Sequence, residues 1–453
     1  MLLYQEIKEV CNNLGKEKES YKRNVISKFK KQWVHIMAYS GLYNKGCETY
    51  SLNNVMLTEY GIKCDIFIVP PLTFDKLNDT RYMLEENLNC SILFYHAKSS
   101  VWVNCKFIFN QNLKKEFIPI KQNNPYELYI CNDFSGEPKF TDMRKYPHLL
   151  VTGTTRSGKS KLTDCILTNL VVNCSSKDVN LYLCQIAKYD LCLYEQLEHT
   201  RAFADTLDKT LIILQYIVEK EIPERSKVIK PYRQKAILDN ISEYNELKST
   251  KDKYPMILIV FDEMSSLFDK KGNNMEITRM KEKIEGYIQA ITQYGASLSV
   301  YIISSVQRPT ANLLPPFIKA MSNTLISLKQ ANSKSSEVAT DDSKLAIGLP
   351  QRQLVYNLDE WEYGIVPLVN NKKIYEYIKP YIKPHKTIFD EIIVKPEGKS
   401  RKILNKSEEI AKNVKKIDNY IPYNEQNSSV KVIDMTKLPI KTQKPLKKGR
   451  REL

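Results

Sequence analysis

Nearly continuous apolar runs alternate with amphipathic stretches through the middle of this chain, and the alternation predicts strands and helices in turn. Such runs are typical of parallel strands that are buried on both faces of a sheet. They lie at residues 148–151, 178–187, 256–261 and 297–305. The stretches between them place apolar residues three or four positions apart, as Leu162, Ile166 and Leu170 do, which indicates helices. Strands that alternate with helices predict an α/β fold with a parallel sheet and right-handed crossovers.

The pattern changes toward both ends of the chain, which predicts four segments. Their expected limits are 1–55 for a helical N-terminal segment, 56–124 for a small α+β module, 125–394 for the α/β core and 395–453 for a basic, largely disordered tail. The first segment would contact nucleic acid or a partner protein, or else cap the next domain. Thr73 is a plausible N-cap for the helix of the module. We expect a helix break at Pro231, and a closing hairpin or edge strands over residues 349–369.

A glycine-containing loop follows the first apolar run. Residues 153–160 read GTTRSGKS, a full match to the phosphate-loop pattern, and a helical pattern begins directly after it. Glycines let backbone N–H groups approach phosphate oxygens, and the N-terminus of a helix adds positive charge. A chance match is the alternative, which the flanking strand and helix disfavour. The residues expected to bind ATP are Gly153, Thr154, Thr155, Arg156, Ser157, Gly158, Lys159, Ser160 and Lys161.

Two adjacent acids, Asp262 and Glu263, end the third apolar run. In open α/β sheets, ligands bind at the carboxyl ends of the strands. Asp262, together with the hydroxyl of Ser160, is therefore predicted to hold Mg²⁺, directly or through water. Glu263 is predicted to polarise the attacking water, and Lys159 to supply charge for the β- and γ-phosphates.

Gln307 ends the fourth apolar run and is the remaining candidate catalytic residue. A polar side chain at the end of a strand beside the γ-phosphate would report whether that phosphate is present. The alternative interpretation is a turn residue that precedes Pro309.

The charge of the chain favours a polyanionic partner, because the formal net charge is +16. Residues 395–453 carry +9 of it, so a solvated lysine-rich tail is the alternative explanation. The ten cysteines form no CxxC pair, which favours reduced thiols over zinc or disulfides. No apolar run reaches the ~18 residues that a membrane span needs, and no signal-peptide pattern begins the chain. We therefore expect a cytoplasmic protein.

Taken together, these segments resemble the FtsK/SpoIIIE family of ATPases that pump double-stranded DNA, and especially its coupling-protein branch from conjugative plasmids and integrative elements. The similarity covers about residues 130–360 and, more weakly, the small module. Arg156 occupies a position that is usually small in the family. The residues that carry the resemblance are 132–138, 146–151, 153–160, Lys188 with Leu193 and Tyr194, Glu224 with Arg225, 244–246, 261–263 and 305–309.

The resemblance implies a RecA-like motor that assembles as a hexameric ring around duplex DNA and hydrolyses ATP, with Mg²⁺, at subunit interfaces. The family roles transfer to Lys159, Ser160, Asp262, Glu263 and Gln307. The predicted function is ATP-dependent DNA translocation in the transfer of a mobile genetic element. The implied partners are double-stranded DNA, further copies of the chain, and a relaxase or a membrane secretion channel.

Three positions depart from the family pattern, and they support an alternative. Ile186 stands where the family has an acid, and Thr292 and Leu325 stand where it has arginines. Hydrolysis would then be slow, or would use another residue such as Arg308 or Arg279 to act on the neighbouring subunit. The family's coupling members usually carry N-terminal transmembrane helices, so membrane recruitment here would need a partner. The alternative function is a nucleotide-gated DNA-binding adaptor with weak ATPase activity, which recruits a relaxase or a replication complex.

Overall fold

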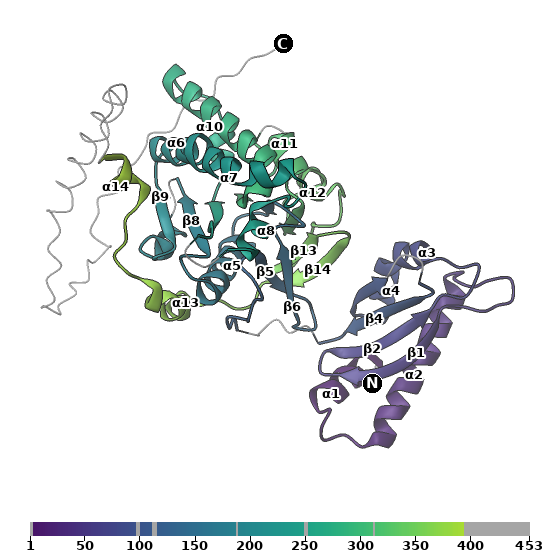
Figure 1. The fold of residues 1–453 in the computed structure, drawn as a ribbon. Coiled ribbons are helices and arrows are strands. Elements are labelled where there is room, and N and C mark those ends of the chain that lie inside the picture. Colours follow the sequence, from purple (N-terminus) through teal and green to yellow (C-terminus); the bar gives the residue numbers. More distant parts are fainter. Residues whose placement is uncertain are drawn as a thin grey trace, which may run out of the picture. The chain divides into compact units, whose positions relative to one another are not determined.

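The computed structural model describes residues 3–96, 100–110, 116–186, 189–248, 252–310 and 313–393 (Figure 1). Two predictions, the disordered tail at 395–453 and the role of Lys188, lie outside the described residues. The described residues up to Glu391 belong to one compact unit, which contains two separate β-sheets. No helix in this described part combines the length and the apolar character that a membrane crossing requires.

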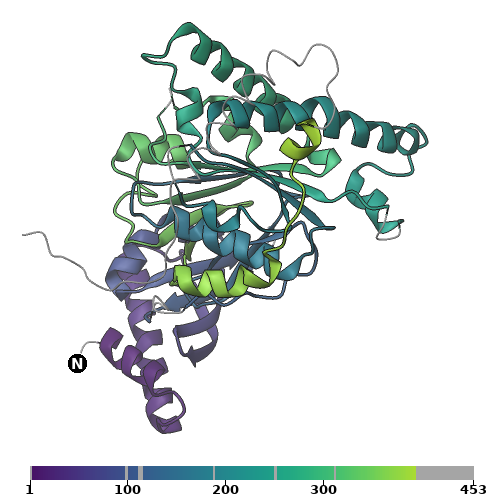
Figure 2. The same cartoon turned by 90° about the vertical axis from the view of Figure 1, so that its left-hand side faces the viewer.

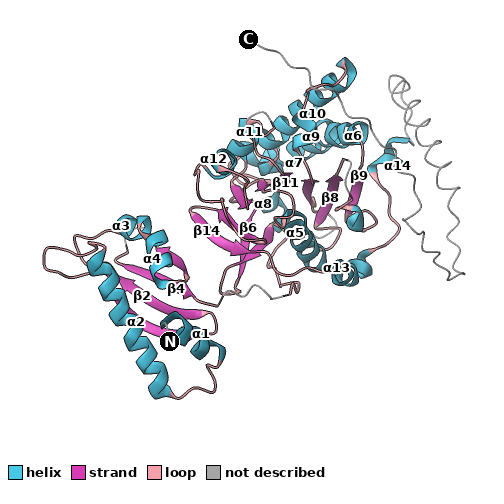
Figure 3. Cartoon of the chain, turned by 180° about the vertical axis from the view of Figure 1, so that it is seen from behind, coloured by secondary structure: helices cyan, strands magenta, loops and turns pink. Residues whose placement is uncertain are grey.

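The smaller sheet is antiparallel, with strands in the order β1-β2-β4-β3, and it packs against helices (Figure 3). Phe29, Trp33 and Ile36 recur every three or four positions in α2, so one face of this helix is buried. The ring of Trp33 lies edge-on to that of Phe107 in β4, with 5.5 Å between the ring centroids. The elements are α1 (Leu3–Asn12), α2 (Glu19–Tyr39), β1 (Ser51–Thr58), β2 (Gly61–Phe67), α3 (Phe74–Asp79), α4 (Arg81–Leu88), β3 (Ser91–His96) and β4 (Trp102–Ile108).

The first two helices thus cap this sheet, which is one of the alternatives expected for the N-terminal segment. β1 was not predicted, and it runs across the limit expected between residues 55 and 56. The limits of the four segments stay predictions. Thr73 accepts a hydrogen bond from the backbone N–H of Lys76 at 3.4 Å, which confirms it as the N-cap of α3.

The larger sheet has ten strands in the order β6-β5-β14-β13-β12-β7-β11-β10-β8-β9. The strands from β12 to β9 in this order are parallel, which confirms the predicted α/β fold with a parallel sheet. The other four are antiparallel to their neighbours and extend the sheet on one side. The strands are β5 (Glu127–Asn132), β6 (Pro138–Asp142), β7 (Leu149–Thr152), β8 (Val179–Cys184), β9 (Thr200–Ala204), β10 (Met256–Phe261), β11 (Val300–Val306), β12 (Thr324–Leu328), β13 (Gln353–Asn357) and β14 (Trp361–Ile365).

Helices cover both faces of the larger sheet (Figure 1, Figure 2). Successive residues of β10 pack on opposite faces of the sheet. Leu258 and Val260 pack with α5, whereas Ile257 and Ile259 pack with α6, α7 and α10. The α-helices are α5 (Lys159–Asn173), α6 (Leu207–Tyr216), α7 (Ile222–Gln234), α8 (Ile241–Glu246), α9 (Ser265–Phe268), α10 (Met275–Tyr294), α11 (Pro316–Met321), α12 (Ser333–Thr340), α13 (Asn371–Ile378) and α14 (Ile388–Ile393). Short 3₁₀ segments are η1 (Cys192–Tyr194), η3 (Ala296–Leu298) and η4 (Lys379–Tyr381).

A π-helical turn, η2 (Ile217–Glu221), joins α6 to α7 in one long helical segment. Arg225 of α7 is only 1% exposed and donates hydrogen bonds to the backbone oxygens of Leu298 at 3.0 Å and Pro255 at 2.8 Å. These bonds fix α7 to the edge of the sheet at which β10 and β11 begin. The helix break predicted at Pro231 is wrong, because α7 continues past this residue. The two hydrogen bonds that anchor α7 through Arg225 outweigh the loss of the one backbone hydrogen bond that proline removes.

Residues 349–369 contain the predicted hairpin, formed by β13 and β14. The alternative of edge strands is wrong, because β14 also pairs with β5, where Ile365 lies opposite Asn132. The hairpin therefore lies inside the sheet, and β5 and β6 lie beyond it. β9 was not predicted either, since its five residues include Thr200 and Arg201 and give no continuous apolar run.

Candidate functional site

The carboxyl ends of four neighbouring parallel strands, β7, β11, β10 and β8, meet at one edge of the larger sheet. β7 ends level with β11 and β10 ends level with β8, while β11 extends two residues beyond the end of β10. Val306 of β11 lies opposite Thr152 of β7, and Phe261 of β10 lies opposite Cys184 of β8. The predicted phosphate loop and the predicted catalytic residues directly follow these strands, so the fold brings them to the edge at which ligands of α/β sheets bind.

The loop that follows β7 requires both of its glycines. Gly153 has φ +151°, and a Cβ there would lie 2.8 Å from Ser157 Oγ and 2.9 Å from Leu328 Cβ. Gly158 has φ +120°, a conformation that side chains rarely allow. Arg156 is exposed, and its backbone adopts a left-handed conformation with φ +63°. The loop leads directly into the N-terminus of α5, whose unpaired N–H groups suit an anion.

The first residues of α5 place a cation and a hydroxyl beside the loop. Lys159 is 6% exposed, and its Nζ donates to the backbone oxygens of Gly153 at 2.5 Å and Thr154 at 3.3 Å. Ser160 Oγ donates a hydrogen bond to Asp190 Oδ2 at 2.8 Å. Both side chains lie where the sequence predicts a phosphate and its metal ion.

Lys161 contacts a different part of the structure. Its Nζ donates to Asp164 Oδ2 at 3.1 Å and also to Asn371 Oδ1 of α13. Burial raises the pKa of Asp164 to about 6, although the charge of Lys161 opposes this shift. The hydroxyl of Tyr194 donates to Asp164 Oδ1 at 3.2 Å. The Lys161 ammonium, which the sequence assigns to nucleotide binding, therefore joins α5 to α13.

The predicted catalytic residues contact one another and the loop. Glu263 Oε1 accepts hydrogen bonds from the backbone N–H of Gln307 at 3.2 Å and from the hydroxyl of Ser265. Gln307 Oε1 in turn accepts a hydrogen bond from Thr155 Oγ1 at 3.4 Å, which is longer than the usual ~2.5–3.0 Å and therefore weak. Asp262 is 3% exposed and lies beside them at the end of β10. Residues from three strand ends thus form one continuous site.

Sequence reasoning missed three residues at this site: Asp190, Gln185 and Arg352. The backbone N–H of Arg352 donates to the loop oxygen of Ser157 at 2.9 Å, and its Nη1 donates to Val366 O at 3.1 Å. Burial lowers the pKa of Arg352. A buried glutamine at the end of an apolar run is a signal that could have pointed to Gln185. No sequence signal marks the other two.

The residues present fit ATP with Mg²⁺. The buried Ser157 hydroxyl finds no hydrogen-bond partner among the described residues and lies within the phosphate loop. Ser160 and Asp262 supply only hydroxyl and carboxylate oxygens, which are the ligands that Mg²⁺ prefers. Lys159 and the N-terminus of α5 supply positive charge for phosphates.

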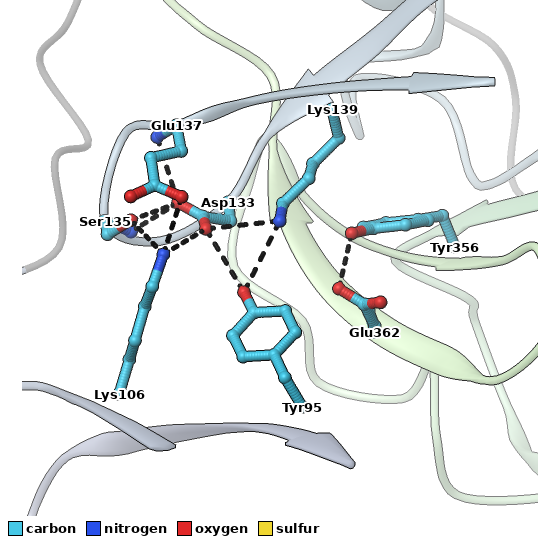
Figure 4. A network of polar contacts seen from close by, with 8 residues as sticks. All are labelled: Tyr95, Lys106, Asp133, Ser135, Glu137, Lys139, Tyr356 and Glu362. Atoms are coloured by element: carbon cyan, nitrogen blue, oxygen red, sulfur yellow. Dashed lines mark hydrogen bonds and ion pairs between the residues drawn. The ribbon is translucent and has the colours of Figure 1, made fainter. Parts of the chain in front are cut away.

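The segment 132–138, which contributes to the family resemblance, lies at a different place and forms a buried ionic cluster (Figure 4). Asp133 is fully buried and accepts hydrogen bonds from the backbone N–H groups of Ser135 at 2.9 Å and Glu137 at 3.0 Å. Lys106 lies 3.2 Å and Lys139 3.6 Å from its carboxylate. Burial by itself would raise the pKa of Asp133, but the Ser135 hydroxyl and the lysines outweigh it and lower that pKa.

This cluster joins the two sheets. Lys106 and Tyr95 belong to β4 and β3 of the smaller sheet, whereas Asp133 lies between β5 and β6 of the larger one (Figure 4). The hydroxyl of Tyr95 donates to Asp133 Oδ2 at 3.3 Å. Nearby, the guanidinium of Arg81 in α4 lies 5.0 Å from the ring centroid of Tyr363 in β14. The segment is therefore a structural joint between the two sheets.

A mixed sheet with a phosphate loop after a central strand, and acids after a neighbouring strand, defines a phosphate-loop ATPase. The model of the FtsK/SpoIIIE family matches residues 121–353. The chain belongs to this family, as its sequence motifs predicted.

Two curated relatives illustrate the match. The DNA translocase FtsK of Helicobacter pylori strain J99 is 26% identical over 223 residues, which are 49% of this chain and 25% of the relative. The DNA translocase FtsK of Clostridium tetani is 28% identical over 222 residues, which are 48% of this chain and 28% of the relative. The chain thus spans about a quarter of the length of these relatives.

Among solved structures, the chain is similar to the pCW3 conjugation coupling protein TcpA in its monomer form with ATPγS. The TM-score is 0.52 at 20% identity, over 78% of this chain and 99% of that one. At this identity the likeness supports the fold alone.

Proposed function

We propose that this chain is an ATP-driven motor that moves double-stranded DNA, works as a homo-hexamer and serves the transfer of a mobile genetic element. The observation that carries the proposal is the site at which the phosphate loop, Glu263 and Gln307 contact one another. The family, its DNA-translocating relatives and the net charge of +16 support DNA as the polyanion.

The side chains have distinct roles in this proposal. Lys159 binds the β- and γ-phosphates, and Ser160 with Asp262 holds Mg²⁺, which neutralises phosphate charge when bound. Glu263 takes a proton from the attacking water, and the donors that hold its Oε1 fix its orientation. Gln307 reports the γ-phosphate, because its side chain contacts the loop and its backbone contacts Glu263.

The test is ATPase activity of the full chain with and without duplex DNA. We expect duplex DNA to stimulate hydrolysis, and Lys159→Ala to abolish it. Lys209→Ala is the matched control, because the Lys209 side chain is 41% exposed and its ammonium forms a surface ion pair with Asp205 at 2.9 Å. Equal hydrolysis by the Lys159→Ala variant and the control would refute the proposed site.

The adaptor with weak ATPase activity stays a second candidate, supported by two positions where the family has arginines. Thr292 is buried and its hydroxyl donates to Gln289 O at 2.9 Å, and Leu325 packs against the core. Arg308 is exposed beside Gln307 and would have to act on a neighbouring subunit instead. ATP-dependent displacement of a triplex-forming strand from duplex DNA would exclude the adaptor.

A further inference from the structure

The hydrogen bond from Ser160 Oγ to Asp190 Oδ2, 2.8 Å long, brings an unpredicted carboxylate to a proposed metal ligand. A serine hydroxyl has one O–H donor and two lone pairs. Ser160 can therefore donate to Asp190 and still offer a lone pair to a cation. The two functions of the hydroxyl do not compete, and a carboxylate acceptor makes the oxygen a better ligand.

The turn that carries Asp190 is held firmly in this place. Gln185, at the end of β8, is 2% exposed, and its Oε1 accepts a hydrogen bond from the backbone N–H of Leu191 at 2.6 Å. Its Nε2 donates to Cys192 Sγ at 3.3 Å. The hydroxyl of the fully buried Tyr194 lies 2.9 Å from that of Thr168 in α5. The turn is thus bonded both to β8 and to the helix that carries Ser160.

We infer that Asp190 is a positioning residue for the metal ion: it orients the Ser160 hydroxyl so that a lone pair meets Mg²⁺. Its carboxylate acts from outside the first coordination shell, and Gln185 holds its turn. The inference rests on the proposed nucleotide site and adds a residue that the loop pattern does not contain. Loss of such an outer partner weakens metal affinity about 10–100-fold.

The first experiment measures binding of a fluorescent ATP analogue to the full chain, with EDTA or with increasing Mg²⁺. For Asp190→Asn we expect unchanged affinity in EDTA and a requirement for about tenfold more Mg²⁺. Asp190 is exposed, so the substitution leaves the fold intact. The matched control is Asp205→Asn, an exposed acid directly after the neighbouring strand β9, which should behave as wild type.

The second experiment combines Asp190→Asn with Ser160→Ala. If Asp190 acts through the Ser160 hydroxyl, its substitution should change the Mg²⁺ requirement by less than about twofold once that hydroxyl is gone. An equal shift in both backgrounds would overturn the inference, because the carboxylate would then act by charge alone. A wild-type Mg²⁺ requirement for Asp190→Asn would also overturn it. A wild-type chain that never binds the analogue would instead refute the nucleotide site itself.

Discussion

Replacement of Asp133 with alanine should lower the free energy of unfolding by about 3–5 kcal/mol, because it takes one of two ion-pair partners from a buried lysine. Asp133 is fully buried, and Lys106 is 6% exposed. The substitution also removes the acceptor of the backbone N–H groups of Ser135 and Glu137. Lys106 keeps one ion pair, with Glu137 at 2.7 Å, so the effect should lie toward the lower end of this range.

Lys106→Met should cost less, about 1–2 kcal/mol, although it breaks the same ion pair. The methionine retains most of the buried aliphatic stem. Asp133 meanwhile keeps its two backbone donors and Lys139 at 3.6 Å. The double variant should be more stable than the sum of the single changes predicts, by about 1–3 kcal/mol, because no charge is then left buried and unpaired.

The assay is urea unfolding of the full chain, followed by circular dichroism and tryptophan fluorescence. Asp359→Ala is the control. Asp359 forms an ion pair with Lys145 at 3.4 Å, and both side chains are largely exposed. Exposed ion pairs contribute about 0–1 kcal/mol to stability.

The pH dependence of stability provides a second test of the contribution of Asp133. The pKa of Asp133 is lowered in the folded chain, so its contribution is present above the ordinary aspartate pKa of 3.8 and disappears as the pH falls through the folded value. The free energies of unfolding of wild type and Asp133→Ala should therefore become equal at acid pH. A loss no larger than that of Asp359→Ala at neutral pH, or a difference that persists in acid, would refute the reasoning.

Three further predictions concern other parts of the structure. Gly153→Ala should abolish nucleotide binding measured by fluorescence, because its Cβ would lie 2.8 Å from Ser157 Oγ; unchanged binding would contradict the loop geometry. Arg225→Met should destabilise the chain by about 2–4 kcal/mol in urea, since two buried backbone oxygens lose their donors. The pKa of Asp164 is raised to about 6, so the contribution of this carboxyl group to stability should fall as the pH rises from about 4 to about 6. Asp164→Asn should remove this contribution. If the stabilities of wild type and variant ran parallel as a function of pH, the raised pKa could not belong to Asp164.

The sequence predicted those parts of the fold and site whose signals are local. The run that ends at Phe261 is buried on both faces, and the loop pattern itself requires the conformations seen at Gly153 and Gly158. Asp190 could not be found in this way, because it reaches Ser160 across thirty residues only after β8 and α5 have packed. Contacts of that kind depend on tertiary structure, which no short pattern encodes.

At Pro231 the sequence does carry a local signal, but tertiary contacts override it, so the prediction made from it was wrong. Its local preference is to end a helix, and the prediction followed that preference. The hydrogen bonds of Arg225, six residues earlier in α7, hold the helix in place regardless of that preference. Tertiary anchoring overrides intrinsic propensity when the buried side of the helix is fixed.

The π-helical turn at Ile217–Glu221 sets the phase of the helix behind it. A π turn amounts to one residue inserted into a regular helix. The π turn absorbs that residue, whereas a regular α-helix over the same residues would rotate all that follows by about 100°. Arg225 would then turn away from the oxygens of Pro255 and Leu298, so the π turn is the feature that brings its guanidinium to these two acceptors.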